Sequence, residues 1–537
     1  MTNMKPQSLT RHTGILRIAK ELSLRNLVQC CLVVASILMS TSICSASATN
    51  VYLAQNSAGG GNGADCADAL PVSWFNNSAN WGSGATQIGP GTTVHLCGTI
   101  SSALTFQGSG SSTSPVTLLF ENGAQMSAPN WGSGGGAINS SGNGYLIVDG
   151  GTNGVIHATS NGTGLATQYD NTGVGLSACA GCIVRNLTVA NMYVHTCTEP
   201  VSNCTDENGQ NSSGIYVSDG SNVSIHNNTV YGAKWCLFYT VGTTQSSVSI
   251  YGNTVYNCDH GAAVGGEGSA SVSGIQVYSN VIHDGQNWDD AANNNHHDGI
   301  HFWTGSGSFS GVQEYNNYMY GDWGNNFNSF LFAEGTQTGA QYFNNVLIDQ
   351  SSVSHNGCGY ICLENNSPVI ANNTIVGPGT AINVSYNSGN VVENNTISNA
   401  YRATQVASQA DIAVWDYNNY YNLGTCGWNC GTFASWQSGG NDAHGSNTNP
   451  NLSGTYTPTS SSTALMQGAN LASLGISQLD LDKAGVCRPS SSCTSPGTST
   501  SLAISASSPW TIGAYQLNSG TTANTPNPPT GLIASVQ

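Results

Sequence analysis

The sequence predicts an all-β solenoid, a parallel β-helix, and three observations support this prediction. The 537 residues include 66 Gly and only 7% charged residues, a composition typical of many short strands joined by tight turns. A short strand followed by Asn recurs at intervals of 22 to 37 residues. A second, apolar strand recurs once in each interval. A coil of this length cannot bury its own core, so we expect the coils to stack.

The recurring Asn marks a fixed turn in each coil. Its column comprises Asn228, Asn253, Asn280, Asn317, Asn345, Asn373, Asn395 and Asn419, with a weaker early copy at Asn186. Asn tolerates the left-handed backbone of a tight turn, and its amide can bond to the same Asn on the coils above and below. We therefore interpret this column as a structural ladder and not as a site.

The second strand of each repeat directs one apolar face toward the core, because side chains alternate along a strand. The residues of this face are Ile215, Leu237, Ile300, Phe330, Ile361 and Ile382. Each strand is expected to pair with its copy one coil away, at about 4.8 Å.

With these repeats, residues 140–425 resemble the right-handed parallel β-helix proteins of the pectate-lyase-like superfamily. The resemblance implies the fold but not the activity, because this fold carries lyases, hydrolases, epimerases and adhesins. Residues 482–488 and 512–515 are similar to the closing segment of many secreted bacterial β-helix proteins, and we expect them to cap or extend the last coil. We interpret residues 49–139 as an N-terminal cap with the first irregular coils, 426–516 as C-terminal coils and closing segment, and 517–537 as a flexible tail.

Residues 1–48 are typical of a signal peptide, with a basic start, an apolar run over residues 27–39 and small residues at 46–48. The alternative is an uncleaved anchor, but the apolar run is short for a membrane span. We therefore expect a secreted protein (extracellular, periplasmic or on the cell surface), a monomer with no stable membrane insertion after removal of the signal.

Cysteine usage agrees with export. Fourteen of the 17 Cys lie beyond residue 48, and each has a close neighbour, which predicts seven local disulfides of an oxidising compartment. The expected pairs are Cys66/Cys97, Cys179/Cys182, Cys197/Cys204, Cys236/Cys258, Cys358/Cys362, Cys426/Cys430 and Cys487/Cys493.

The charge balance restricts the partners. Five of the ten Lys and Arg and one of the 27 Asp and Glu lie in residues 1–48, so the rest of the chain is strongly acidic. This excludes nucleic acid as a partner, because phosphate binding needs a basic surface. A polyanionic sugar would also be repelled unless a cation such as Ca²⁺ bridges the carboxylates.

Two inserts, residues 195–211 and 286–297, lead into the second strand of their coils from the same corner. We expect them to form the walls of a groove. Alignment of the coils at the start of this strand gives three columns. The first contains Lys234, Asp259 and His297; the second contains Trp235, His260, Asp298 and Asn328; the third contains Tyr216, Phe238, Ala263, His301 and Leu331.

Ionisable and aromatic residues gather in these columns. The candidate catalytic residues are Lys234, Asp259, His260, His297, Asp298 and His301. The candidate substrate-binding residues are Tyr216, Trp235, Trp288, Trp303 and Trp323, since flat rings beside carboxylates suit a sugar. Residues 296–301 could supply acid, base or metal ligands, whereas any single His among them is equally compatible with a ladder position.

A calcium site is a further hypothesis. Asp259, Asp289, Asp290 and Asp298 could hold Ca²⁺ through oxygen ligands, although Asp-rich loops also occur as solvated turns. Glu334 and Glu364 are among several further acids near the same face.

Three functions follow from these patterns. The first is a secreted polysaccharide lyase in which a cation neutralises a uronate, and Lys234, His297 or His301 removes the C5 proton; Lys234 is equally compatible with a surface ion pair. The second is a glycoside hydrolase with Asp259 and Asp298 as its paired carboxylates. The third is a glycan-binding or adhesin solenoid without catalysis. The acid and base cluster favours an enzyme, with the lyase first.

Overall fold

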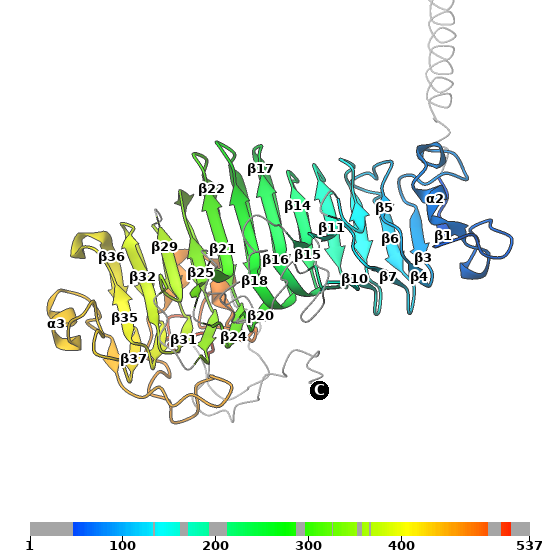
Figure 1. The fold of residues 1–537 in the computed structure, drawn as a ribbon. Helices are drawn as coiled ribbons and strands as arrows, with labels where there is room; N and C mark the ends of the chain where they lie inside the picture. Colours follow the sequence, from blue (N-terminus) through cyan, green and yellow to red (C-terminus); the bar gives the residue numbers. More distant parts are fainter. Residues whose placement is uncertain are drawn as a thin grey trace, which may run out of the picture.

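The computed structural model describes residues 47–132, 135–161, 170–192, 212–285, 296–324, 326–351, 357–364, 367–491 and 506–516. The fold is a right-handed parallel β-helix, as predicted, in which the coils stack along one axis (Figure 1). Every pairing between the named strands is parallel, and each strand pairs with its copy on the next coil. The expected signal peptide, most of both inserts and the tail lie outside the described residues.

One sheet runs along almost the whole stack. Its successive strands are β1 (Asn50–Ala54), β3 (Thr93–Leu96), β6 (Val116–Phe120), β9 (Leu146–Asp149), β12 (Ile183–Arg185), β15 (Val223–His226), β17 (Gln245–Tyr251), β19 (Val272–Tyr278), β23 (Gln313–Tyr315), β27 (Gln341–Phe343), β30 (Val369–Ala371), β33 (Asn390–Glu393) and β36 (Ile412–Asp416). The sheet therefore begins within the residues expected to form the cap and first irregular coils. Short strands flank it: β2 (Leu70–Pro71) pairs with β1, and β22 (Phe309–Ser310) pairs with β19 and with β26 (Gln337–Thr338).

Two further rows of strands complete each coil. The first row contains β4 (Thr99–Ile100), β7 (Gln125–Ala128), β10 (Val155–Ala158), β13 (Thr188–Ala190), β16 (Thr229–Val241), β18 (Thr254–Gly266), β20 (Val281–His283), β24 (Tyr318–Gly321), β28 (Val346–Asp349), β31 (Thr374–Val376), β34 (Thr396–Ser398), β37 (Asn419–Tyr421) and β38 (Ser446–Asn447). The second row contains β11 (Thr172–Ser177), β14 (Ser213–Ser218), the later parts of β16 and β18, β21 (His297–Thr304), β25 (Phe327–Ala333), β29 (Ile361–Glu364), β32 (Thr380–Tyr386) and β35 (Arg402–Gln405). The short strands β5 (Leu104–Thr105) and β8 (Ile138–Asn139) pair with each other.

The asparagine ladder is confirmed from Asn228 to Asn395, and each amide bonds to the next coil. The final step differs from the prediction: Asn395 donates from Nδ2 to Oδ1 of Asn418 at 3.0 Å, and Asn418 donates in turn to Asp442, so Asn419 is not a member. In the early coil Leu187 occupies the ladder position and donates its N–H to Asn228.

The left-handed backbone belongs to the residue before each ladder Asn. Asn186, Asn227, Asn316, Asn344, Asn372 and Asn394 all have φ between 52° and 58°. Two neighbouring residues therefore divide the tasks that we assigned to one: the first adopts the turn conformation, and the second extends its amide along the stack.

The inward apolar column is confirmed with one shift of register. Ile215, Leu237, Ile300, Ile361 and Ile382 are buried and lie in successive pairings. The residue that pairs with Ile300 is Leu331 and not Phe330, because a bulge between His297 and Asp298 offsets the partner strand by one residue.

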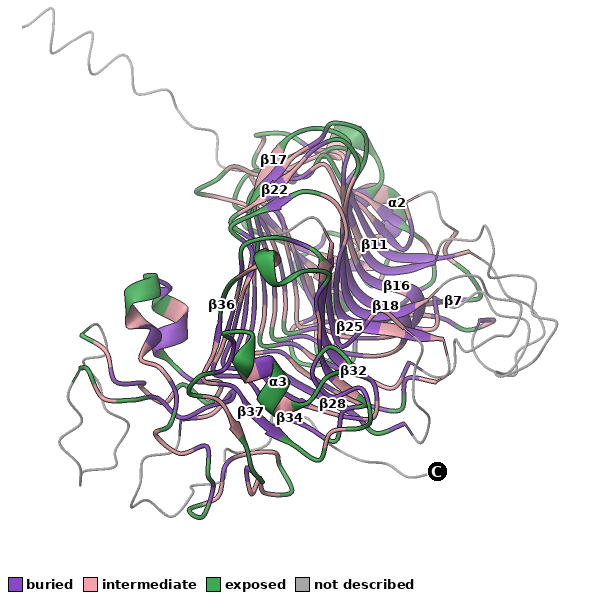
Figure 2. Ribbon diagram, turned by 90° about the vertical axis from the view of Figure 1, so that its left-hand side faces the viewer, coloured by how far each residue is buried: buried purple, intermediate pink, exposed green. Residues whose placement is uncertain are grey.

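The two ends of the stack are closed differently. The short helix α2 (Val72–Phe75) belongs to the N-terminal cap, and α3 (Phe433–Ser438) lies in front of the stacked coils at the other end (Figure 2). Trp436 of α3 is buried in the core cluster. This segment, and not residues 482–488 and 512–515, closes the C-terminal end.

The closing segment folds back along the flank of earlier coils. Arg488 donates to Oδ1 of Asn344 at 2.8 Å, and Asn372 donates to the carbonyl oxygens of Thr511 and Gly513. Figure 1 shows these orange and red residues beside the green coils near β24 and β25, away from the yellow end of the stack. The expectation that the segment caps or extends the last coil is therefore wrong.

Five of the seven predicted disulfides are confirmed. They are Cys66–Cys97, Cys179–Cys182, Cys236–Cys258, Cys358–Cys362 and Cys426–Cys430. Cys197, Cys204 and Cys493 lie outside the described residues. Within the described ranges, no helix has the length and apolar character needed to cross a membrane.

Candidate active site

The candidate site lies on the outer face of three consecutive coils, at β16, β18 and β21. Parallel pairing places Trp235 beside His260 and His260 beside Asp298. One further pairing places Ala263 beside His301. The alignment of these columns from the sequence agrees with this register as far as β21, and the bulge then shifts β25, so that Ser329 and Phe332 replace Asn328 and Leu331.

Asp298 is the centre of the site. Its Oδ2 lies 2.6 Å from Nδ1 of His296, 3.4 Å from Nε2 of His260 and 3.7 Å from Nδ1 of His301. Its Oδ1 accepts a hydrogen bond from Nδ2 of Asn328 at 3.1 Å. Three imidazoles therefore converge on one fully buried carboxylate.

Asp259 forms a second layer beneath this carboxylate. Its two oxygens bond to Nδ1 of His297 at 2.7 Å and to Nδ1 of His260 at 3.0 Å. Asp259 and His297 have no exposed surface, so neither can contact a glycan directly. Both residues were candidates for catalysis, and their position instead lets them orient His260.

Charge and burial act in opposite directions on these groups. Burial alone would raise the pKa of Asp298, but His296 and His260 hold it well below its usual range. Burial would lower the pKa of His260, but Asp259 and Asp298 raise it to about 9. Burial lowers the pKa of His301. The site therefore combines ionised carboxylates with imidazoles of unlike basicity.

Glu334 is the residue of the site that the sequence columns did not select. Its Oε2 lies 3.1 Å from Nε2 of His301, and it is half-buried. Trp303, Glu334 and Glu364 follow the paired residues Phe302, Ala333 and Leu363 on three consecutive coils. Glu334 and Glu364 lie two positions beyond the third column once the one-residue shift at the bulge is included. A fourth column at that position would therefore have identified both glutamates.

An aromatic row borders the histidines. Trp235 stacks on Phe238 with ring centroids 4.6 Å apart and contacts His260 at 4.2 Å. Trp303 contacts His301 at 5.0 Å, and Tyr216 contacts Phe238 at 5.2 Å. Tyr216, Trp235, Phe238 and Trp303 are each half-buried.

Trp323 does not belong to this row. It is 1% exposed and packs in the core against Phe327 and Phe330. Its role as a substrate-binding residue is therefore corrected to a core role. Trp288 lies outside the described residues.

Lys234 lies at the edge of the cluster, in the same column as Asp259. Its side chain is buried, and Nζ lies 6.0 Å from the centre of the Trp235 ring. Lys234 is therefore adjacent to the aromatic row.

The Ca²⁺ ion that the sequence suggested would have only part of its predicted ligand set among the described residues. Calcium takes six to eight oxygen ligands, whereas the described groups around Asp298 are mainly imidazole nitrogens and both oxygens of Asp259 bond to histidines. Asp289 and Asp290 lie outside the described residues.

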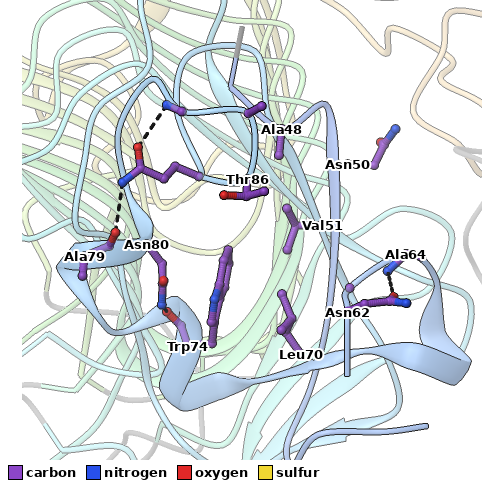
Figure 3. Close-up of a pocket in the computed structure, with 14 residues that line it drawn as sticks. Ala48, Asn50, Val51, Asn62, Ala64, Leu70, Trp74, Ala79, Asn80 and Thr86 are labelled. Carbon is purple, nitrogen blue, oxygen red and sulfur yellow. Dashed lines mark hydrogen bonds between the residues drawn. The ribbon is translucent and has the colours of Figure 1, made fainter. Parts of the chain in front are cut away.

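Two cavities of about 630 Å³ lie at the ends of the molecule and not at this cluster. One is in the N-terminal cap, where Trp74, Val51, Leu70 and Asn80 point toward it (Figure 3). The other lies beside Trp428 and Phe433 at the C-terminal end. Neither is lined by a residue of the cluster.

Solved structures with a similar fold include carbohydrate-active proteins. Pectate lyase Pel9A is 13% identical, with 88% of this chain and 100% of that chain covered and a TM-score of 0.41. XylC in complex with xylose is 10% identical, with 75% and 87% covered and a TM-score of 0.42. A GH136 lacto-N-biosidase from Eubacterium ramulus is 12% identical, with 71% and 66% covered and a TM-score of 0.40.

No protein-family model and no curated protein sequence matches the chain. Likenesses this distant do not indicate an activity, so the function depends on the residues of the chain itself.

Proposed function

We propose that the chain is a polysaccharide-degrading enzyme that acts outside the cytoplasm, with its chemistry at the histidine–carboxylate cluster. The observation that carries this proposal is the contact between the cluster and the aromatic row: Trp235 touches His260, and Trp303 touches His301. Aromatic rings can stack on sugars, and the groups beside them can exchange protons. The five disulfides suit an oxidising compartment.

The reaction that we place first is β-elimination from a uronate-containing glycan. A base removes the C5 proton, the electron pair forms the C4–C5 double bond, the C4–O bond breaks, and the leaving oxygen takes up a proton. Lys234 and the imidazoles supply the groups that can act as base or as positive charge beside the uronate.

A second candidate is hydrolysis, favoured by the adjacency of Glu334 and Glu364. The two residues follow paired positions on neighbouring coils, beside Trp303. Glycoside hydrolysis uses two carboxyl groups about 5 to 10 Å apart. The pair expected from the sequence, Asp259 and Asp298, suits this role less well, because both are fully buried and bonded to histidines.

The test is a panel of neutral and acidic polysaccharides offered to the purified protein. An unsaturated product that absorbs in the ultraviolet, lost in Lys234→Ala or His301→Gln, supports elimination. New reducing ends without unsaturation, lost in Glu364→Gln, support hydrolysis. Trp323→Phe, a substitution in the core, is the control and should retain the activity. No cleavage of any polysaccharide by the folded protein contradicts the enzyme and favours a glycan-binding solenoid.

A further inference from the structure

We propose that His260, Asp298 and His301 bind one divalent transition-metal ion of the zinc class. The ligand atoms of these three buried residues all lie within 4.8 Å of one another. The catalytic role of the metal depends on the proposed function, whereas metal binding itself does not.

The first argument is the direction of two buried nitrogens that make no hydrogen bond. Nε2 of His260 and Nδ1 of His301 are buried and have no hydrogen-bond partner among the described residues. Both face Oδ2 of Asp298, at 3.4 Å and 3.7 Å. A buried polar atom without a hydrogen bond costs about 1–3 kcal/mol, and a shared cation would give both nitrogens a ligand bond in place of these long contacts.

The second argument is the spacing of the ligand atoms. In a tetrahedral site with metal–ligand bonds of about 2.0–2.1 Å, neighbouring ligand atoms lie about 3.3–3.4 Å apart. The 3.4 Å distance from His260 to Asp298 matches this edge, and the 3.7 Å distance from His301 exceeds it by about 0.3 Å, a gap that small side-chain movements would close. Two imidazoles and one carboxylate leave a fourth position for water or for a sugar oxygen.

The third argument is the support around each ligand. The second nitrogen of a metal-bound histidine commonly donates to a carboxylate, which fixes the ring and its tautomer. His260 bonds through Nδ1 to Asp259, and His301 bonds through Nε2 to Glu334. Each ring therefore has one nitrogen held by a carboxylate and the other directed at the shared centre.

Asp298 is supported in the same way. Nδ2 of Asn328 donates to its Oδ1, and His296 bonds to its Oδ2. A carboxylate oxygen has two lone pairs, so Oδ2 can accept from His296 and still bind a metal. The donor set of nitrogen and one carboxylate selects zinc-class ions over calcium and magnesium, which prefer oxygen.

In the proposed reaction, such an ion would supply positive charge beside a uronate or polarise a sugar oxygen. Trp235 and Trp303 flank the ligands His260 and His301, so a sugar stacked on either ring would lie close to the open position.

The test uses the untagged full chain after treatment with a chelator. Zn²⁺ binding is measured by calorimetry, and Co²⁺ serves as a spectroscopic probe, because its visible absorption reports tetrahedral nitrogen and oxygen ligands. We expect one equivalent to bind to the wild type. His260→Gln and His301→Gln should each weaken binding at least 100-fold, and Glu334→Gln, which removes a supporting group, should weaken it about 10–100-fold.

His444→Ala is the matched control, because His444 bonds to Asp416 at 2.7 Å in a histidine–carboxylate pair elsewhere on the surface. It should bind the metal like the wild type. Circular dichroism checks that each variant is folded. Absence of Co²⁺ and Zn²⁺ binding to the wild type, undiminished binding by both Gln variants, or equal competition by Ca²⁺ would each overturn the metal site.

The two proposals fail separately. If the wild type binds metal and the Gln variants do not, but no polysaccharide is cleaved, the metal site is supported and the proposed enzymatic function is contradicted. If the protein cleaves a polysaccharide but binds no transition metal, the enzymatic function is supported and the metal site is contradicted.

Discussion

Cys236 and Cys258 join the two coils that carry the first half of the site. Their Cα atoms lie 5.9 Å apart. Cys236 follows Lys234 and Trp235, and Cys258 precedes Asp259 and His260. The bond therefore fixes the spacing between the aromatic row and the histidines, as well as stabilising the stack.

Replacing both cysteines with Ala should lower stability by about 3 kcal/mol, the usual effect of a disulfide that closes a loop of this length, and should also impair the site. The readouts are the denaturant midpoint and the affinity for Zn²⁺ or polysaccharide. The control is the double Ala variant of Cys66 and Cys97, a disulfide of similar span in the N-terminal cap. Equal effects of both double variants on the site would show that the Cys236–Cys258 bond does not position it.

The asparagine ladder should contribute strongly to stability. Oδ1 of Asn345 accepts from the N–H and Nδ2 of Asn317, and Nδ2 of Asn345 donates to the backbone carbonyl oxygen of Glu314 and to Oδ1 of Asn373. Asn345→Ala leaves several buried groups unsatisfied, at about 1–3 kcal/mol each, so we expect a loss of at least about 3 kcal/mol in the free energy of unfolding, measured with denaturant.

Gln313→Ala provides the matched control for the ladder. Gln313 belongs to a partly exposed amide ladder between Gln276 and Gln341, with bonds of 2.9 and 2.8 Å. Water can replace these bonds, so the cost should stay below about 1 kcal/mol. If the two variants lost the same stability, burial would not explain the ladder's contribution.

The repeat made the fold predictable because each coil copies the previous one. Register followed from the sequence wherever no residue was inserted, which is why Trp235, His260 and Asp298 could be aligned. The bulge at His297 and Asp298 displaced the next strand by one residue, and this hid the position of Glu334. Composition gives no sign of such a bulge.

Other features depend on contacts that a periodic pattern does not contain. Arg488 and Asn344 are 144 residues apart in the chain, so the fold-back of the closing segment could not follow from local spacing. The sequence repeat predicted that His260 and Asp298 lie on neighbouring coils, but it could not show which ring nitrogen of His260 faces the carboxylate. That detail supports our proposal of a zinc-class ion, whereas the expected calcium site includes Asp289 and Asp290, which lie outside the described residues, and stays a prediction.

Arg488 should hold the closing segment on the coils. Its guanidinium is buried, donates to Asn344 and to the carbonyl oxygens of Gly513 and Ala514, and lies 5.4 Å from the centre of the Trp510 ring. Arg488→Leu removes these charged hydrogen bonds, at a cost of about 3 kcal/mol. We expect limited proteolysis to cut the closing segment faster in this variant, while the stack remains folded.

The comparison for Arg488 is Arg185→Leu. Arg185 bonds to Asp149 at 2.7 Å, and its side chain is 36% exposed, so its loss should cost less than about 1 kcal/mol and leave the cleavage pattern unchanged. Identical proteolysis of the wild type and Arg488→Leu would contradict an anchoring role.

Glu314 should destabilise the fold at neutral pH. Its side chain has no exposed surface, and neither carboxyl oxygen has a hydrogen-bond partner among the described residues. Burial raises the pKa of Glu314 well above its usual range. The folded state therefore binds a proton that the unfolded state releases, so stability is greatest below the usual pKa of Glu and is lost as pH rises. Glu314→Leu should be about as stable as the wild type at low pH and about 1–3 kcal/mol more stable near neutral pH.

The measurement for Glu314 is the free energy of unfolding at several pH values for the wild type, Glu314→Leu and Glu267→Leu. Glu267 is exposed, so its variant should follow the wild type at every pH. The difference between Glu314→Leu and the wild type must grow with pH, because the unfolded state ionises Glu314 above its usual pKa while the folded state keeps the carboxyl protonated. A constant difference would mean that the Glu314 carboxyl has a solvent path or a partner that keeps its pKa near the usual value.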